Sequence, residues 1–165
     1  MPVTDSQPVP TVVEVTDASL TSAAARIVAA GFTGSDGEYT VEASARQVLD
    51  DLRVDVFALL DRACAKGDAG ETVTHDLFGE KMPQRVILVG LGSQSGQDYR
   101  RAGAALARLA VGGGRLATSV AAHADDVATD AFVEGLVLGA FGFHRKSDKQ
   151  APPQRPVVVL SDLPK

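Results

Sequence analysis

Apolar and polar positions divide the chain into stretches that predict strands and helices in alternation. Short β-branched or apolar runs bounded by turn residues predict buried strands. We place these strands at residues 11–15, 24–32, 71–77, 85–91, 115–120 and 156–160. The strand at 24–32 has an alternative, because a helix over residues 19–30 also fits this part of the sequence.

Apolar residues that recur every three or four positions predict three helices. We place these helices at residues 41–65, 97–110 and 125–139. Ser95 is the expected N-cap of the second helix, with Asp98 in its first turn, where a carboxylate faces the positive end of the helix dipole. Three glycines at 112–114 end this helix, and the Asp125–Asp126 pair opens the third.

Strands that alternate with helices predict an α/β fold, in which helices cover both faces of a mixed, mostly parallel central sheet. Residues 1–10 are polar and rich in proline, which predicts a disordered leader. Residues 11–165 are then expected to form a single domain, long enough to bury a real core.

Composition narrows the classes of function. The 165 residues include 16 Lys or Arg and 21 Asp or Glu, a formal net charge of −5. This balance makes nucleic-acid binding unlikely as a role, because such surfaces usually carry an excess of basic residues. With Cys64 as the one cysteine, neither an internal disulfide nor a cysteine zinc cage can form. The start is not a signal peptide and no apolar run approaches the roughly 20 residues of a membrane span, so we expect a cytoplasmic protein.

A glycine-rich loop at residues 90–96 (GLGSQSG) joins a predicted strand to a predicted helix. The backbone amides of such a loop can hold a phosphate at a helix N-terminus. Its third glycine comes one position late for the dinucleotide fingerprint, and no acidic residue stands where a ribose would need it. A tight turn is therefore favoured over a dinucleotide site.

The titratable side chains do not converge on an active site. The histidines are His75, His123 and His144. None has a second histidine four residues away, the spacing that places two imidazoles around zinc on one helical face. Paired carboxylates occur at Asp50–Asp51 and Asp125–Asp126. Neighbours on a helix point about 100° apart, so neither pair forms an acid–base dyad. We predict no catalytic, cofactor-binding or metal-binding residue in this chain.

Other polar residues favour structural roles. Glu134 lies among apolar residues and must reach solvent, a partner or an interface. Cys64 is interpreted as a structural thiol rather than a nucleophile. Two groups of basic residues are interpreted as solvated surface rather than as a nucleic-acid patch. They are Arg100, Arg101, Arg108 and Arg115, and then Arg145, Lys146, Lys149 and Arg155.

Three motifs in a fixed order resemble the N-terminal domain of leucyl aminopeptidases, also called cytosol aminopeptidases. They are residues 86–92 (VILVGLG), 99–110 (YRRAGAALARLA) and 131–143 (AFVEGLVLGAFGF). Glu134, Gly135 and Leu138 match the family's third motif, whereas Phe141 stands where tyrosine is common and Ser93 where lysine often follows the Gly-Leu-Gly. The resemblance covers nearly the whole chain.

This resemblance implies a macrodomain-like, three-layer fold without catalytic residues. The family's two divalent metals, manganese or zinc, are bound in a separate C-terminal catalytic domain, whose Asn-Thr-Asp-Ala-Glu-Gly-Arg signature does not occur here. The implied partners are that catalytic domain and further copies in a hexamer of two stacked trimers. The alternative hypothesis is a free-standing, macrodomain-like binder of ADP-ribose or another nucleotide, and a third is an accessory role in binding DNA.

Overall fold

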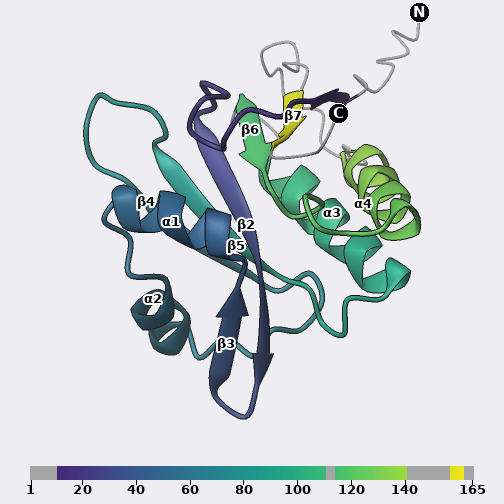
Figure 1. Cartoon of the computed structure of the whole chain (residues 1–165), viewed down its shortest axis with the longest axis horizontal. Coiled ribbons are helices and arrows are strands. Elements are labelled where there is room, and N and C mark those ends of the chain that lie inside the picture. The colour runs from purple at the N-terminus through teal and green to yellow at the C-terminus, as the bar shows by residue number, and fades with distance from the viewer. Residues whose placement is uncertain (1–10, 111–113, 141–156, 162–165) are drawn as a thin grey trace, which may run out of the picture.

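A seven-stranded sheet forms the centre of the computed structural model, which describes residues 11–110, 114–140 and 157–161 (Figure 1). The strands are β1 (Val12–Val15), β2 (Ile27–Ser35), β3 (Glu38–Val41), β4 (Thr72–Asp76), β5 (Arg85–Gly90), β6 (Arg115–Thr118) and β7 (Val157–Leu160). The helices are α1 (Ala43–Asp51), α2 (Val56–Arg62), α3 (Gly96–Ala110) and α4 (Asp126–Gly139).

The order of strands across the sheet is β1-β7-β6-β2-β5-β4, and β3 pairs with β2. Every neighbouring pair from β1 to β5 in this order is parallel. The exceptions are β4, which runs antiparallel to β5, and β3, which runs antiparallel to β2. This mixed, mostly parallel sheet confirms the predicted α/β fold class.

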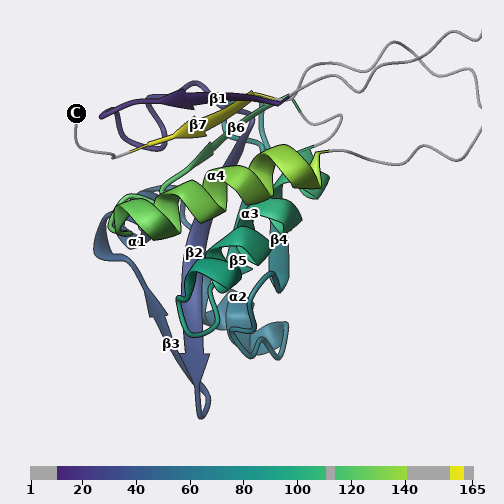
Figure 2. The same cartoon turned by 90° about the vertical axis from the view of Figure 1, so that its right-hand side faces the viewer.

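Helices cover both faces of the sheet, so the domain has three layers (Figure 2). The face under α3 and α4 is filled by one apolar cluster that includes Leu106, Phe132 and Leu136. A second cluster, which includes Phe32, Leu49 and Leu60, lies under α1 and α2. The strands contribute to both clusters because successive side chains of a strand point to opposite faces.

Glycines set the distance between α3 and α4. A Cβ atom at Gly103 would lie within 3.0 Å of the Phe132 carbonyl oxygen, closer than real Cβ atoms approach. The same holds for Gly135 against the backbone of Arg100 on α3. The backbones of the two helices therefore lie in direct contact at these positions. Glycine makes this contact possible, although its conformational freedom destabilises a helix.

The predicted helix at 41–65 is wrong in one respect, because the structure has two helices there. Arg53 adopts a left-handed backbone with φ of 60°, which no helix continues through. Asp55 then caps α2, its carboxylate accepting a hydrogen bond from the Ala58 amide at 3.0 Å. Apolar spacing continues across the break and conceals it, because the two helices pack on the same side of the sheet.

Most of the stretch at 24–32 is a strand, which begins at Ile27 rather than at residue 24, so the competing helix over 19–30 is wrong. The strand extends to Ser35 and turns through Asp36 and Gly37 into β3, which the sequence analysis did not predict. Both turn residues have positive φ, 51° and 83°, as a two-residue hairpin of type I′ requires. The Asp-Gly pair in the sequence was the available signal for this hairpin.

Candidate functional site

The carboxyl ends of β2 and β5 are where an open α/β sheet usually binds a ligand. In this chain residues 66–70, which we call the capping loop, lie directly on those two strand ends. A Cβ atom at Gly34 of β2 would lie 2.5 Å from the Lys66 carbonyl oxygen. One at Gly90 of β5 would meet the Asp68 carbonyl oxygen even more closely. Glycine at both positions lets the backbone of the capping loop fill the space.

Hydrogen bonds fix the capping loop in this place. The Gly92 amide donates to the Gly67 carbonyl oxygen at 2.9 Å, and the Gly70 amide donates to the Gly90 carbonyl oxygen at 2.9 Å. The Tyr39 hydroxyl donates to the carbonyl oxygen of Ala65, just before the loop, at 2.9 Å. The loop is thus tied to β5 and to β3.

The amides of the capping loop converge on one carboxylate. Those of Lys66, Gly67 and Asp68 donate to Oε2 of Glu71 at 3.0, 2.8 and 3.2 Å. Successive backbone amides that converge in this way form a nest that binds anions. Here the anion is the chain's own side chain. This role of Glu71 cannot be predicted from its neighbours in the sequence, among which the turn glycines just before it are the one hint.

The glycine-rich loop at 90–96 is also occupied by a carboxylate of the chain. Oδ2 of Asp98 accepts hydrogen bonds from the Ser93 amide at 3.1 Å and from the Ser93 hydroxyl at 2.7 Å. These bonds, above all that from the Ser93 hydroxyl, hold the pKa of the Asp98 carboxyl below its usual value. The Asp98 amide donates to Oγ of Ser95 at 3.2 Å, which confirms Ser95 as the N-cap of α3. The loop is a tight turn in which the amides of residues 90–94 donate to other groups of the chain.

The structure describes two of the three histidines. His75 lies half-buried on β4, at one end of the sheet order. His123 lies in the loop before α4, with Nε2 3.2 Å from Oε1 of Glu42. His144 lies outside the described residues. The two described histidines are on different elements, so they do not form a common site.

Cys64 is exposed at the end of α2, with a left-handed φ of 52°, so its thiol is not part of the core. This corrects the expectation of a structural thiol. The expectation that Glu134 reaches solvent, a partner or an interface is confirmed, since its half-exposed carboxylate reaches both solvent and Arg100. Oε2 of Glu134 lies 2.7 Å from Nη2 of Arg100, and both side chains are about half exposed. The pair links α3 to α4 at the surface.

The two carboxylate pairs have structural positions. Asp50 and Asp51 are exposed at the end of α1, where Asp51 accepts a hydrogen bond from Gln47 at 3.1 Å. Asp125 caps α4, accepting from the Ala128 amide at 2.8 Å, and Asp126 lies in its first turn, as predicted.

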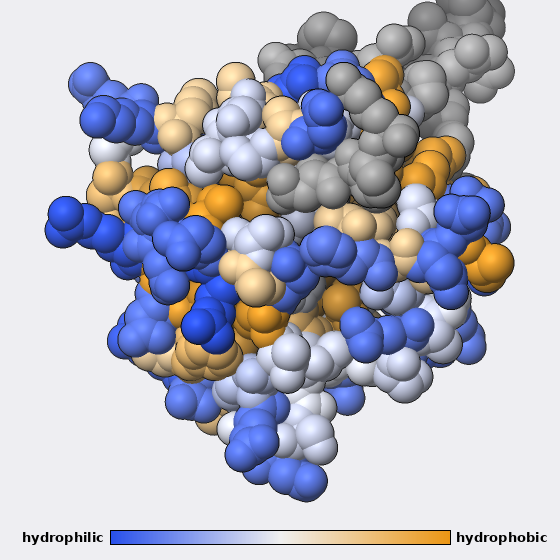
Figure 3. Space-filling model, in the orientation of Figure 1, coloured by the Kyte–Doolittle hydropathy of each residue, from blue (hydrophilic) through white to orange (hydrophobic). Residues whose placement is uncertain are grey.

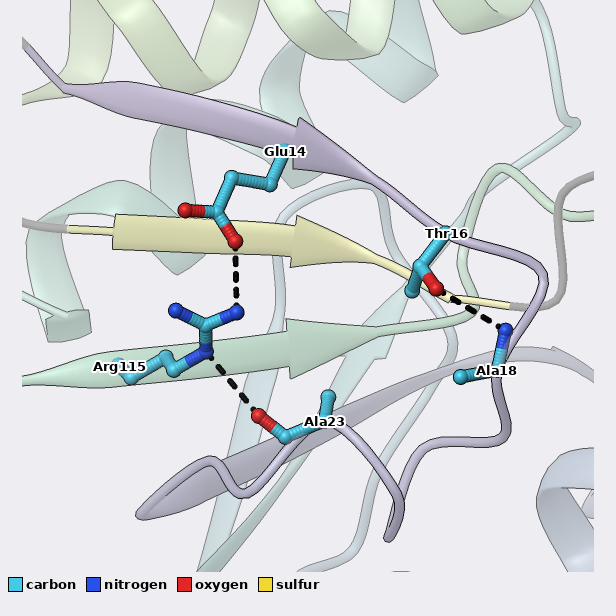
Figure 4. A network of polar contacts seen from close by, with 5 residues as sticks. All are labelled: Glu14, Thr16, Ala18, Ala23 and Arg115. Carbon is cyan, nitrogen blue, oxygen red and sulfur yellow. Dashed lines mark hydrogen bonds and ion pairs between the residues drawn. The ribbon is translucent and has the colours of Figure 1, made fainter.

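Basic residues of the first group lie on two elements, α3 and β6. Arg101 and Arg108 are exposed on α3, and Arg115 contacts other parts of its own chain (Figure 4). From β6, Nη2 of Arg115 reaches Glu14 of β1 at 2.6 Å, and its Nε donates to the Ala23 carbonyl oxygen at 3.0 Å. The second group, at residues 145–155, lies outside the described residues.

An open hollow of about 410 Å³ lies at the elbow between α1 and α2. Arg46 and Arg53 line it together with Asp50 and Asp55, so the charges cancel. The guanidinium of Arg46 lies over the Phe57 ring, 5.7 Å from its centre, and occupies the aromatic face. The lining of the hollow therefore carries no formal net charge.

Apolar surface on the face seen in Figure 3 is broken into patches among polar side chains. The large exposed apolar residues of the described chain are Val15, Phe57, Phe78, Met82, Val127 and Leu138. Across residues 11–110, 114–140 and 157–161, no three His, Cys, Asp or Glu side chains are grouped to hold a metal ion. In the same ranges, no helix is both long and apolar enough to cross a membrane.

Comparison with known sequences assigns most of the chain to a protein family. The sequence model of the cytosol aminopeptidase family, N-terminal domain, matches residues 35–149. No curated protein sequence matches the chain.

Solved structures share the fold. A leucine aminopeptidase from tomato, the K354E mutant, superposes with a TM-score of 0.69 at 18% identity, over 92% of this chain and 32% of its own. The bottromycin maturation enzyme BotP gives 0.53 at 24% identity, over 82% and 27%. The macrodomain of DarG from Mycobacterium tuberculosis gives 0.58 at 14% identity, over 91% and 98%. The chain therefore spans about a third of the tomato enzyme and the full length of a macrodomain, and the predicted macrodomain-like fold is confirmed.

Proposed function

Because the chain belongs to the cytosol aminopeptidase family, as its N-terminal domain, we propose that it is a non-catalytic packing module of a leucyl aminopeptidase. The parent enzyme releases N-terminal amino acids from peptides with two divalent metals, manganese or zinc, bound in a C-terminal catalytic domain. This chain packs on that domain and contributes to assembly of a hexamer or to its regulation, in the cytoplasm. Residues 11–165 act as the one folded unit.

The closed carboxyl ends of β2 and β5 are the observation that carries this proposal. The capping loop fills the position where the fold class would hold a ligand, and Glu71 and Asp98 accept the hydrogen bonds that a phosphate would accept. A domain whose amides are satisfied internally in this way contributes rigid surface to an assembly.

We expect the metal chemistry of the parent enzyme in its catalytic domain and not in this domain. The described residues do not provide a set of oxygen, nitrogen or sulfur ligands in one place, so they do not fit a metal pair. BotP has been solved in complex with manganese, which is consistent with a metal in the catalytic domain of relatives. Polarising the scissile carbonyl and activating water are then tasks of that second domain.

Binding to the catalytic domain is the direct test of this function. The catalytic part of the parent enzyme, produced as a separate chain, should bind this chain in calorimetric titration and gain stability or activity from it. This chain alone, supplied with manganese or zinc, should not hydrolyse a leucyl anilide. Hydrolysis by the purified chain would contradict the non-catalytic role, and failure to bind the catalytic part would contradict the packing role.

The alternative of a nucleotide-binding macrodomain has support from the fold alone. The two anion-binding loops that it would use are occupied by Glu71 and Asp98. A nucleotide would have to displace both carboxylates, which makes this function the weaker proposal. The acidic net charge similarly disfavours the accessory role in DNA binding.

A further inference from the structure

The outer edge of β4 presents free backbone groups. Among the described residues, β4 pairs with β5 alone. The Gly90 amide donates to the Glu71 carbonyl oxygen, and the Leu77 amide donates to that of Gln84. In an antiparallel ladder these bonds recur at every second residue, so the odd-numbered residues of β4 face β5. The amides and carbonyls of Thr72, Thr74 and Asp76 therefore point outward.

This edge lacks the features that usually prevent strands from pairing between molecules. Natural edge strands carry lysine, proline or a bulge for that purpose. β4 has the sequence TVTHD and pairs with β5 in unbroken register. Its one acidic side chain, Asp76, is neutralised by Arg85 of β5, with Oδ1 and Nε 2.6 Å apart. Small, uncharged Thr72 and Thr74 make up the rest of the outward register.

We propose that a second copy of this chain pairs antiparallel with β4 through that edge, about a twofold axis at Thr74. The hydrogen-bonded pairs must join even-numbered residues, because only their groups are free. An axis at Thr74 places Thr74 opposite its counterpart and Thr72 opposite Asp76, so all five residues of each strand overlap. An axis at any other residue of β4 shortens this overlap, and an axis at Asp76 also places that carboxylate opposite its counterpart. Like charges directly opposite are destabilising, which favours Thr74.

Two exposed apolar side chains follow the strand in the link to β5. Phe78 is 100% exposed and Met82 is 56% exposed. Phe78 lies two residues beyond the end of β4, next to the segment that would pair. Pairing of the strands would thus cover apolar surface that the single chain leaves in water. The contact deepens the assembly role proposed above by naming one surface through which copies meet.

Residue-resolved hydrogen exchange of the full chain tests the pairing. As concentration rises from low micromolar toward millimolar, the amides of Thr72, Thr74 and Asp76 should become protected. The amides of Val73 and His75 should change little, because they already donate within the sheet. Sedimentation velocity over the same range should show conversion of monomer to dimer. A chain that stays monomeric throughout would overturn the proposal and leave packing on the catalytic domain untouched.

Substitutions at the axis separate this edge from other surfaces. Thr74→Lys should weaken dimerisation at least tenfold, and Thr74→Pro should abolish it by removing the outward amide. Gln47→Lys, at an exposed position on α1, is the matched control and should leave the dimer intact. If Thr74→Pro does not fold, Thr74→Lys still gives the result. A dimer that persists in Thr74→Lys would place assembly on another surface and overturn the β4 contact alone.

Disulfide trapping tests the register in a Cys64→Ala background. Thr74→Cys should give a covalent dimer under mild oxidation, because the axis places the two residues opposite each other. Gln47→Cys should remain monomeric under the same conditions. Failure of Thr74→Cys to cross-link while the even-numbered amides are protected would contradict the proposed axis. Protection that requires the catalytic part of the parent enzyme would assign the edge to that domain and contradict self-pairing.

Discussion

Backbone polar groups are in opposite states at the carboxyl ends of β2 and β5 and at the outer edge of β4. At the strand ends, the capping loop lies on Gly34 and Gly90, and internal carboxylates bond the amides around it. Along β4, the amides of alternate residues face outward. The region that the fold class reserves for a ligand is therefore closed, and the open hydrogen-bonding surface is an edge suited to another strand.

Among the substitutions that test this comparison, Gly90→Ala should change the stability of the chain most. The new Cβ atom would collide with the backbone of the capping loop, so we expect the free energy of unfolding to fall by about 3 kcal/mol. Urea unfolding followed by circular dichroism gives the value. Gly96→Ala, at the other end of the glycine-rich loop at 90–96, is the control, because its Cβ atom would meet nothing closer than 3.9 Å. Equal losses in the two variants would mean that the capping loop does not lie on β5.

Removal of the Glu71 carboxylate should cost about 2 kcal/mol, because Glu71→Ala leaves three converging amides without their charged acceptor. The exposed Glu80→Ala should change the unfolding free energy little. Inorganic phosphate should raise the melting temperature of Glu71→Ala more than that of the unmodified chain, because an empty nest binds anions. An equal response to phosphate would show that Glu71 does not occupy an anion-binding nest.

Asp98→Asn should lower the unfolding free energy by about 1 kcal/mol at neutral pH, through the loss of charged hydrogen bonds to Ser93. The pKa of Asp98 is depressed in the folded chain, so its contribution is complete above the pKa of the unfolded carboxyl. That contribution is lost as pH falls through the folded pKa. Unfolding curves of the two proteins should therefore converge in acid. A difference that is constant down to the lowest pH would contradict the assigned role of the carboxylate.

Substitutions along the outer edge of β4 should have the smallest effect on the single chain. Thr74 is exposed and its backbone groups point away from β5, so Thr74→Lys should change the unfolding free energy by about 0.5 kcal/mol or less. Dilute samples measured by urea unfolding keep association out of the result. A loss comparable with that of Gly90→Ala would mean that the edge is already covered within the chain.

The sequence predicted the order of most elements because their signals are local. Apolar runs located the strands, and the caps at Ser95 and Asp125 located the starts of α3 and α4. The hairpin to β3 also had a local signal in Asp36–Gly37, which follows the strand predicted at 24–32. The break between α1 and α2 had a weaker one, Asp55 as a cap, hidden by apolar spacing that continues through it.

The closed strand ends could not be predicted because they depend on contacts between distant parts of the chain. In the sequence, Gly34 and Gly90 indicate no more than turns. The contact of both residues with the capping loop exists only in the folded chain. The partner of Asp98 depends on the path of the glycine-rich loop, which its composition does not determine. A loop of this kind suggests a phosphate site in sequence, whereas in the structure the amide and hydroxyl of Ser93 are bonded to Asp98.

Titration of the ¹⁵N-labelled chain with ADP-ribose, followed by the amide resonances of Lys66, Gly67, Asp68 and Ser93, tests the central claim most directly. If Glu71 and Asp98 already accept these hydrogen bonds, the four resonances should not move at high micromolar ligand. Saturable shifts at these amides would contradict the closed strand ends and favour a nucleotide-binding domain.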